Sequence, residues 1–152
     1  MNRQITNCKF DVYINTGSGT TPITGFPTNL RVFTGAYTYK PYYYTGSAYD
    51  EALDGSLRSQ LGGYRFEAIL NWERLLDAEP LMNVINNAYT TGTGEVVIDF
   101  YPDATNATFY ETVIITDVSW QSSIDATMVR QPLSISLIGK TVKPTIPSFY
   151  IL

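Results

Sequence analysis

The sequence predicts a mainly β protein, an antiparallel β-sandwich or barrel with one short α-helix. Three observations support this prediction. The stretch from Tyr64 to Leu75 alternates between the two faces of a strand, and this period of two is typical of a strand with one buried face. A single segment, at about 78–89, has the 3.6-residue period of a helix. Charged residues make up only 16% of the chain, and the threonine, asparagine and tyrosine that replace them suit β structure.

The part of the chain before the long central strand predicts strands separated by long connections. A strand, a loop and a second strand are expected at Lys9–Ile14, 15–29 and Leu30–Thr34. Residues 36–44 are rich in tyrosine and are interrupted by Pro41, which confines them to an edge strand or an extended arm. The connection that follows, up to Gly63, is too long for a tight hairpin, and loops of such length usually have a function or move. We therefore expect an extended loop or arm over residues 36–63.

The central strand and the helix are expected to form the core together. Phe66, Leu70 and Trp72 lie on one face of the strand. Asp77 is the expected N-cap of the helix, and Gly92 is its expected C-terminal cap. The apolar stripe of the helix consists of Leu81, Val84, Ile85 and Ala88. The two stripes should face each other across the interior.

The remainder of the chain predicts three strands and an extended tail. The strands are expected at Glu95–Tyr101, Phe109–Trp120 and Pro132–Val142. The tail, 143–152, contains two prolines and apolar residues, so we expect it to dock as an extended segment on a neighbouring subunit, with its own barrel as the alternative. At this length the chain is most simply one domain, 1–152.

The residue types of the chain argue against catalysis. The absence of histidine removes serine–histidine and cysteine–histidine catalysis and nearly all zinc enzymes. Four carboxylates fall on or beside adjacent strands, at Asp99, Asp103, Glu111 and Asp117. Their spacing does not define the pair that a glycosidase needs. Cys8 is the single cysteine and is interpreted as structural, without a disulfide. We expect no enzymatic activity, no catalytic, cofactor-binding or metal-binding residues, and no cofactor.

Charge and hydropathy exclude two further classes of protein. The net charge is −4 and no basic run is present, which argues against general nucleic-acid binding. No stretch approaches 18 apolar residues, and the first residues have no apolar core of a signal peptide. We expect a protein that folds in a cytosol without a membrane span.

The tyrosine-rich segment has three interpretations. It could pack on its own barrel, stack on carbohydrate, or reach a neighbouring subunit, because tyrosine is enriched at protein interfaces. The proline within it and the loops on both sides favour the last. The candidate subunit-interface residues are therefore Tyr37, Tyr39, Tyr42, Tyr43, Tyr44, Phe149 and Tyr150.

Residues 54–103 (DGSLRSQLGGYRFEAILNWERLLDAEPLMNVINNAYTTGTGEVVIDFYPD) resemble bacteriophage tail and baseplate structural proteins. In these proteins an arginine-bearing strand, a short helix and a return strand that ends near an acidic turn form part of a small β-barrel. The resemblance implies two packed antiparallel sheets with a helix at one side. It also implies assembly into rings and a long loop that contacts the next ring.

The resulting hypothesis is a structural protein of the virion, in a tail tube, baseplate or collar. It would form homo-oligomeric rings in the bacterial host cytoplasm and line or cap the DNA conduit. Its partners would be copies of itself and neighbouring tail or connector proteins, with DNA contacted non-specifically at most and no membrane. The alternative is a carbohydrate-binding β-sandwich, such as an adhesin or receptor-binding module.

Overall fold

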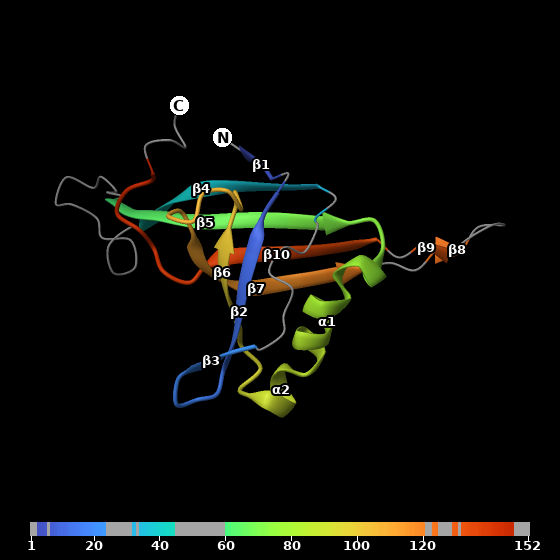
Figure 1. Ribbon diagram of the computed structural model, residues 1–152. Helices are drawn as coiled ribbons and strands as arrows, with labels where there is room; N and C mark the ends of the chain where they lie inside the picture. The colour runs from blue at the N-terminus through green and yellow to red at the C-terminus, as the bar shows by residue number, and fades with distance from the viewer. Residues whose placement is uncertain are drawn as a thin grey trace, which may run out of the picture.

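The computed structural model describes residues 3–5, 7–23, 32, 34–44, 60–120, 123–124, 129–130 and 132–147. Within these residues the chain forms an eight-stranded antiparallel sheet, a two-stranded ribbon and three short helical segments (Figure 1). The strands are β1 (Arg3–Gln4), β2 (Lys9–Asn15), β3 (Thr20–Pro22), β4 (Thr34–Tyr44), β5 (Gln60–Trp72), β6 (Val96–Tyr101), β7 (Glu111–Trp120), β8 (Ser123–Ile124), β9 (Val129–Arg130) and β10 (Leu133–Gly139). The helical segments are η1 (Leu75–Ala78), α1 (Glu79–Asn86) and α2 (Ala88–Thr91).

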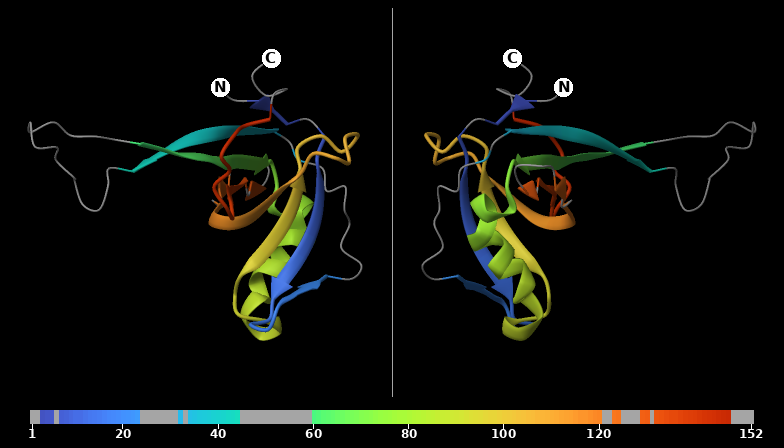
Figure 2. Two further views of the ribbon diagram at one scale, coloured as in Figure 1. Left: turned by 90° about the vertical axis from the view of Figure 1, so that its left-hand side faces the viewer. Right: turned by 90° about the vertical axis from the view of Figure 1, so that its right-hand side faces the viewer.

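The N-terminal stretch closes the large sheet into a barrel. The strand order is β1-β4-β5-β10-β7-β6-β2-β3, so β1 and β2 lie near opposite ends of the sheet although they follow each other in the chain. Beside β1, the Ile5 N–H donates a hydrogen bond to the carbonyl of Gly35 at 2.8 Å, and on the β6 side the Ala104 N–H donates to the carbonyl of Asn7 at 3.2 Å. Figure 2 shows β2 and β6 crossing β4 and β5 at a steep angle. The mainly β, antiparallel fold class is confirmed.

The core joins the faces that were expected to be apolar. Phe66, Leu70 and Trp72 are buried, as are Leu81 and Ala88 of the helical segments. The ring of Phe66 also meets that of Phe100 on β6, with centroids 6.1 Å apart. Leu133, Ile135 and Leu137 of β10 point inward between β5 and β7. The two stripes thus belong to one buried core, against which Val84 and Ile85 pack partly buried.

The beginning of the helix differs from the prediction. Asp77 lies within η1 rather than at an N-cap, and α1 begins after Ala78 without a side-chain cap. The reason is a competing ion pair, because the Arg74 guanidinium binds the Asp77 carboxylate at 3.0 Å. Pro80 lies in the first turn of α1, as expected. None of the helices in the described part of the chain has the length and apolar character needed to cross a membrane.

Both ends of the predicted arm are strands. Residues 36–44 and 60–63 belong to β4 and β5, which pair along their lengths, and residues 45–59 lie outside the described residues. Proline at position 41 is accommodated because β4 lies next to the end of the sheet, with only the short β1 beyond it. The predicted loop at 15–29 contains β3, and most of the expected strand at Leu30–Thr34 lies outside the described residues.

Candidate self-assembly surfaces

The hairpin of β4 and β5 projects from the barrel. Its two strands pair from Thr34 opposite Asn71 to Tyr44 opposite Gln60, with a register shift after Tyr42. Figure 2 shows both strands extending well beyond the body of the molecule. The far part of the hairpin has apolar surface in solvent, since Tyr42, Tyr43 and Leu61 are 48%, 60% and 41% exposed. Exposed aromatic groups at this density are typical of a protein contact.

The predicted interface residues divide into two groups. Tyr37 and Tyr39 point inward and are buried, and the centroid of each ring lies 5.4 Å from that of Phe66. Tyr37 and Tyr39 therefore pack on their own barrel, which was the first of the three interpretations. Tyr42 and Tyr43 lie in solvent, and their place in an interface stays a prediction. The side chain of Tyr44 lies outside the described residues, as do Phe149 and Tyr150.

A buried carboxylate anchors the root of the hairpin. Glu111 of β7 is 3% exposed, and its Oε1 accepts a hydrogen bond from the Tyr39 hydroxyl at 2.8 Å. The Lys143 ammonium also lies 2.8 Å from this oxygen. The backbone of Lys143 exchanges two hydrogen bonds with that of Tyr64, at 2.7 and 2.8 Å. Gly63 permits this contact, because its φ is +127° and a Cβ there would lie 2.5 Å from the Lys143 carbonyl oxygen.

The start of the predicted tail therefore lies on its own barrel. Lys143 bridges to Tyr64 of β5, and Ile146 packs against the core. The ion pair with Glu111 holds Lys143 in this place, and docking of the rest of the tail on a neighbouring subunit stays a prediction. The end of the tail, 148–152, lies outside the described residues.

β7, at the opposite end of the four strands β4, β5, β10 and β7, is paired with β6 over only part of its length. The rest of β7 has an open edge. β6 pairs with β7 only from Glu111 to Ile114, and among the described residues 115–120 pair with β10 alone. A groove of about 430 Å³ runs between this edge and the end of the helical segments. Its lining includes Ile85, Ala88, Val96, Ile115, Asp117 and Val118. An open strand edge beside such a groove is the kind of surface to which another strand can add.

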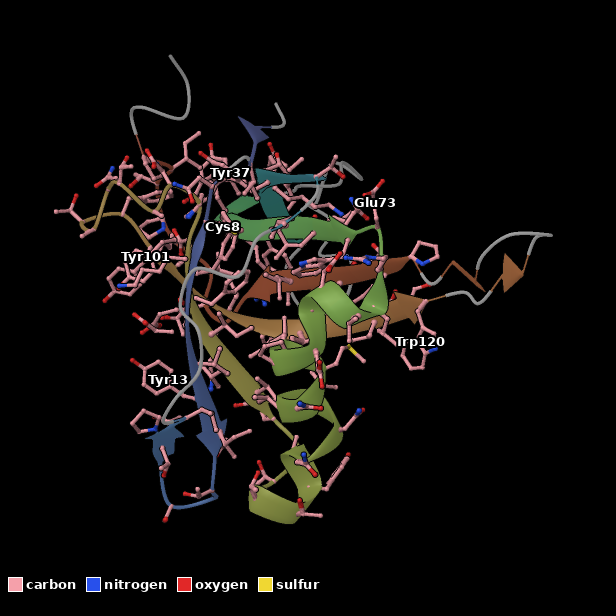
Figure 3. All side chains as sticks on the ribbon, turned by 45° about the vertical axis from the view of Figure 1, so that its right-hand side comes forward. Cys8, Tyr13, Tyr37, Glu73, Tyr101 and Trp120 are labelled. Atoms are coloured by element: carbon pink, nitrogen blue, oxygen red, sulfur yellow. The ribbon has the colours of Figure 1, made fainter. Side chains whose placement is uncertain are left out.

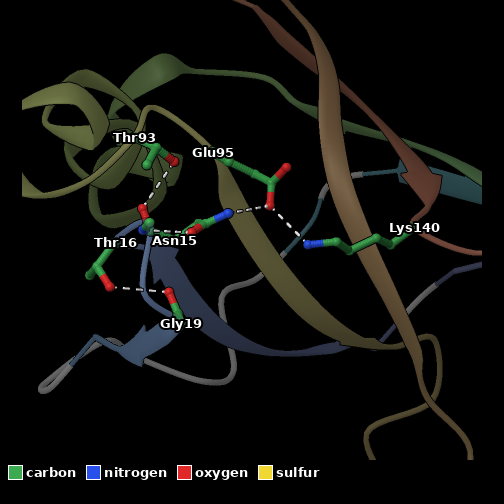
Figure 4. A network of polar contacts seen from close by, with 7 residues as sticks. Asn15, Thr16, Gly19, Thr93, Glu95 and Lys140 are labelled. Carbon is green, nitrogen blue, oxygen red and sulfur yellow. Dashed lines mark hydrogen bonds and ion pairs between the residues drawn. The ribbon is translucent and has the colours of Figure 1, made fainter.

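A polar network holds the near wall of this groove (Figure 4). The Glu95 carboxylate accepts hydrogen bonds from the Asn15 amide at 3.2 Å and from the Lys140 ammonium at 2.9 Å. The hydrogen bond from Lys140 lowers the pKa of Glu95. Thr93 donates from both its N–H and its hydroxyl to the Asn15 carbonyl, at 2.8 and 3.0 Å. The backbone at the end of the helical region is thereby tied to the end of β2.

The outer face of the strands β4, β5, β10 and β7 carries opposite charges at its two ends. Exposed Lys40 of β4 lies directly opposite Arg65 of β5, and like charges in this arrangement destabilise a sheet. Exposed Asp117 lies near the other end, opposite Ser136. Neither Lys40 nor Asp117 has an ion-pair partner in the part of the chain that the structure describes.

The four carboxylates considered for catalysis do not converge. Glu111 points into the barrel, whereas Asp99 is half-buried on the outer face of β6 and accepts a hydrogen bond from Thr112. Asp103 accepts hydrogen bonds from Thr105 in a turn, and Asp117 lies on the outer face of β7. No group of three or more potential metal ligands of the types His, Cys, Asp and Glu occurs among the described residues.

Two further residues complete the account of candidate chemistry. Cys8 is buried, and burial raises the pKa of its thiol to about 12, which suits a structural role. Asp11, which sequence reasoning did not single out, is the cross-strand partner of Asp99. Aligning the alternating faces of Lys9–Ile14 and Glu95–Tyr101 could have drawn attention to it.

Comparison with known proteins yields distant likenesses to solved structures. No protein-family model and no curated protein matches the chain. Among solved structures, a chain from the tail of an empty GTA particle, determined with C6 symmetry, is similar at 12% identity and a TM-score of 0.33. The likeness covers 90% of this chain and 96% of that chain. A likeness this distant identifies neither a family nor a function.

Proposed function

We propose that the protein is a structural component of a bacteriophage tail that assembles head to tail into rings. The single observation that carries this proposal is the four-stranded unit β4–β5–β10–β7, which has a projecting hairpin at one end and an open edge with a groove at the other. A contact between two different surfaces of one chain repeats from copy to copy, and it closes into a ring when the rotation permits. The resemblance of residues 54–103 to tail and baseplate proteins supplies the biological setting.

Strand direction supports this mode of assembly. Each neighbouring pair in the unit is antiparallel, so β4 and β7 run in opposite directions. If β7 of one copy faces the β4 side of the next, the combined sheet stays antiparallel across the junction. The exposed side chains of Tyr43 and Leu61 would then gain apolar contacts on the neighbour.

The charges at the two ends of the unit complement each other. Lys40 is held opposite the like charge of Arg65, and Asp117 stands at the edge that would receive the hairpin. An intermolecular pair of Lys40 with Asp117 would relieve the repulsion between Lys40 and Arg65. The ring would line or cap a conduit for DNA, and the net charge of −4 would let DNA pass without adhesion. The protein would act without catalysis.

Charge reversal tests the proposed contact. Lys40→Glu and Asp117→Lys should each weaken assembly, and the double variant should restore it, as measured by native mass spectrometry and negative-stain imaging. Glu79→Lys, an exposed reversal on α1, is the matched control and should leave assembly unchanged. Single variants that assemble like the wild type would show that the two charges do not meet. A wild-type protein that stays monomeric at high concentration would refute ring assembly itself.

A further inference from the structure

A second polar surface lies on the outer face of β2 and β6, away from the four-stranded unit. Asp11 and Asp99 are directly opposite each other on these strands. Side chains in such positions have Cβ atoms about 4.5–5.5 Å apart, and like charges at this distance destabilise a sheet. The pair therefore needs neighbours that supply positive charge or hydrogen-bond donors.

The protein supplies these neighbours unequally. The Lys9 ammonium lies 3.9 Å from the Asp11 carboxylate and 4.8 Å from the centroid of the Tyr101 ring. Asp99 accepts a hydrogen bond from the Thr112 hydroxyl at 2.8 Å. In the described part of the chain, however, no cationic group lies within 4.0 Å of Asp99. One of the two opposed carboxylates thus has a cation and the other does not.

A tyrosine lies beside each carboxylate, because the Tyr13 hydroxyl hydrogen-bonds to Asp99 and the Tyr101 hydroxyl to Asp11. Tyr13 and Tyr101 lie on the same side of the barrel (Figure 3), and the ring centroids of Tyr101 and Tyr110 are 5.3 Å apart. Burial, followed by the charge of Asp99, raises the pKa of Tyr13, and burial followed by the charge of Asp11 raises that of Tyr101. Both phenols therefore keep their protons over the neutral pH range. Faces of tyrosine rings attract cations, as the position of Lys9 over Tyr101 already demonstrates here.

We infer that this aspartate–tyrosine face (Asp11, Asp99, Tyr13, Tyr101 and Tyr110) binds an arginine side chain presented by a partner protein. The guanidinium would take beside Asp99 the role that the Lys9 ammonium has beside Asp11. Its planar fork of donors suits carboxylates, and its face stacks on aromatic rings. The hydroxyls of a neutral sugar could donate hydrogen bonds to the same carboxylates but would leave the charge of Asp99 without a counter-charge. The inference does not depend on the proposed ring assembly, because it concerns the other part of the sheet.

The probe is a blocked tetra-arginine peptide, titrated at low salt by isothermal calorimetry into the full chain. Asp99→Asn keeps the size of the side chain and removes its charge, so it should weaken binding by at least about tenfold. Tyr110→Ala should also weaken binding, because Tyr110 is 45% exposed and offers a ring face. Glu79→Gln on α1 is the control for loss of an exposed carboxylate elsewhere, and a tetra-citrulline peptide is the control for shape without charge.

Binding of the arginine peptide that Asp99→Asn and Tyr110→Ala weaken and Glu79→Gln preserves would support the inference. Equal losses in Asp99→Asn and Glu79→Gln would reduce the effect to general attraction by an acidic surface and overturn it. Equal binding of the citrulline peptide would overturn it as well. A third outcome is that the arginine peptide does not bind, whereas a neutral oligosaccharide such as cellohexaose binds and Tyr110→Ala abolishes this binding. That outcome would overturn the inference and identify the ligand as a polysaccharide.

Discussion

Replacing Lys143 by methionine should destabilise the barrel through the carboxylate that it leaves behind. Glu111 is 3% exposed, and Lys143 and Tyr39 each lie 2.8 Å from the same oxygen. Methionine keeps most of the apolar stem of lysine, so the change removes charge rather than packing. After the replacement, only the Tyr39 hydroxyl would stabilise the buried charge among these contacts.

The size of the effect follows from the burial of the two partners. Removing one partner of a fully buried ion pair costs about 3–5 kcal/mol, whereas exposed pairs contribute about 0–1 kcal/mol. The Lys143 side chain is 44% exposed and that of Glu111 is 4% exposed, so the pair lies between these limits. We expect a loss of about 2 kcal/mol in the free energy of unfolding, or roughly 4–8 °C in Tm for a domain of this size.

A double-mutant cycle measured by urea unfolding isolates this contribution. Glu111→Gln keeps an acceptor for the Tyr39 hydroxyl and removes the charge, so Lys143→Met in that background should cost about 0.5 kcal/mol or less. The m-value should stay constant across the four proteins. A loss that is the same in both backgrounds would show that Lys143 acts through packing or backbone pairing, and it would refute the role assigned to the charge.

Three further outcomes are expected. Trp72→Ala should cost about 3–5 kcal/mol in urea unfolding, because the indole is buried in the core cluster, and a melting temperature within a degree or two of wild type would contradict this packing. The contribution of the Cys8 thiol to stability should be constant below about pH 9 and fall as the pH rises towards 12, because burial raises the pKa of Cys8 from 9.0 to about 12 and the unfolded thiol ionises first; Cys8→Ala should flatten this part of the pH profile. Gly63→Ala should cost about 1–3 kcal/mol through backbone strain and the clash with Lys143, whereas Gly19→Ala, at φ +154° with nothing within 4 Å of its Cβ, should cost less; equal losses would mean that the contact with Lys143 is unimportant.

The part of the fold that the sequence predicts is the part encoded in local periodicity. The alternation around Phe66 and the stripe that contains Leu81 each define a buried face, whichever element packs against it. The central strand, the helix and the core could therefore be predicted from the sequence. Tyr37 and Tyr39 were harder to place, because tyrosine occurs on both faces of β4 and its polar tip suits either. Asp77 was misassigned because an N-cap signal does not reveal the competing ion pair with Arg74.

The candidate surfaces could be predicted only in part, because they arise from long-range pairing. The exposed tyrosines of the hairpin were singled out by composition, but the open edge of β7 depends on where β6 leaves it. The same holds for Asp11 and Asp99, which are distant in the chain and become neighbours only through the register of β2 and β6.

The closure of the barrel by β1 and β2 constrains the order in which the chain can fold. β1 pairs with β4, whereas β2 pairs with β6, which ends at Tyr101. During synthesis at roughly 5–20 residues per second, the N-terminal strands would wait several seconds after leaving the ribosome before their final partners appear. Contacts over such separations slow folding, because the chain loses the entropy of loop closure before strand pairing contributes favourable free energy. β1 and β2 are thus made well before they can reach their native positions, and until then one end of the growing sheet is available to other chains.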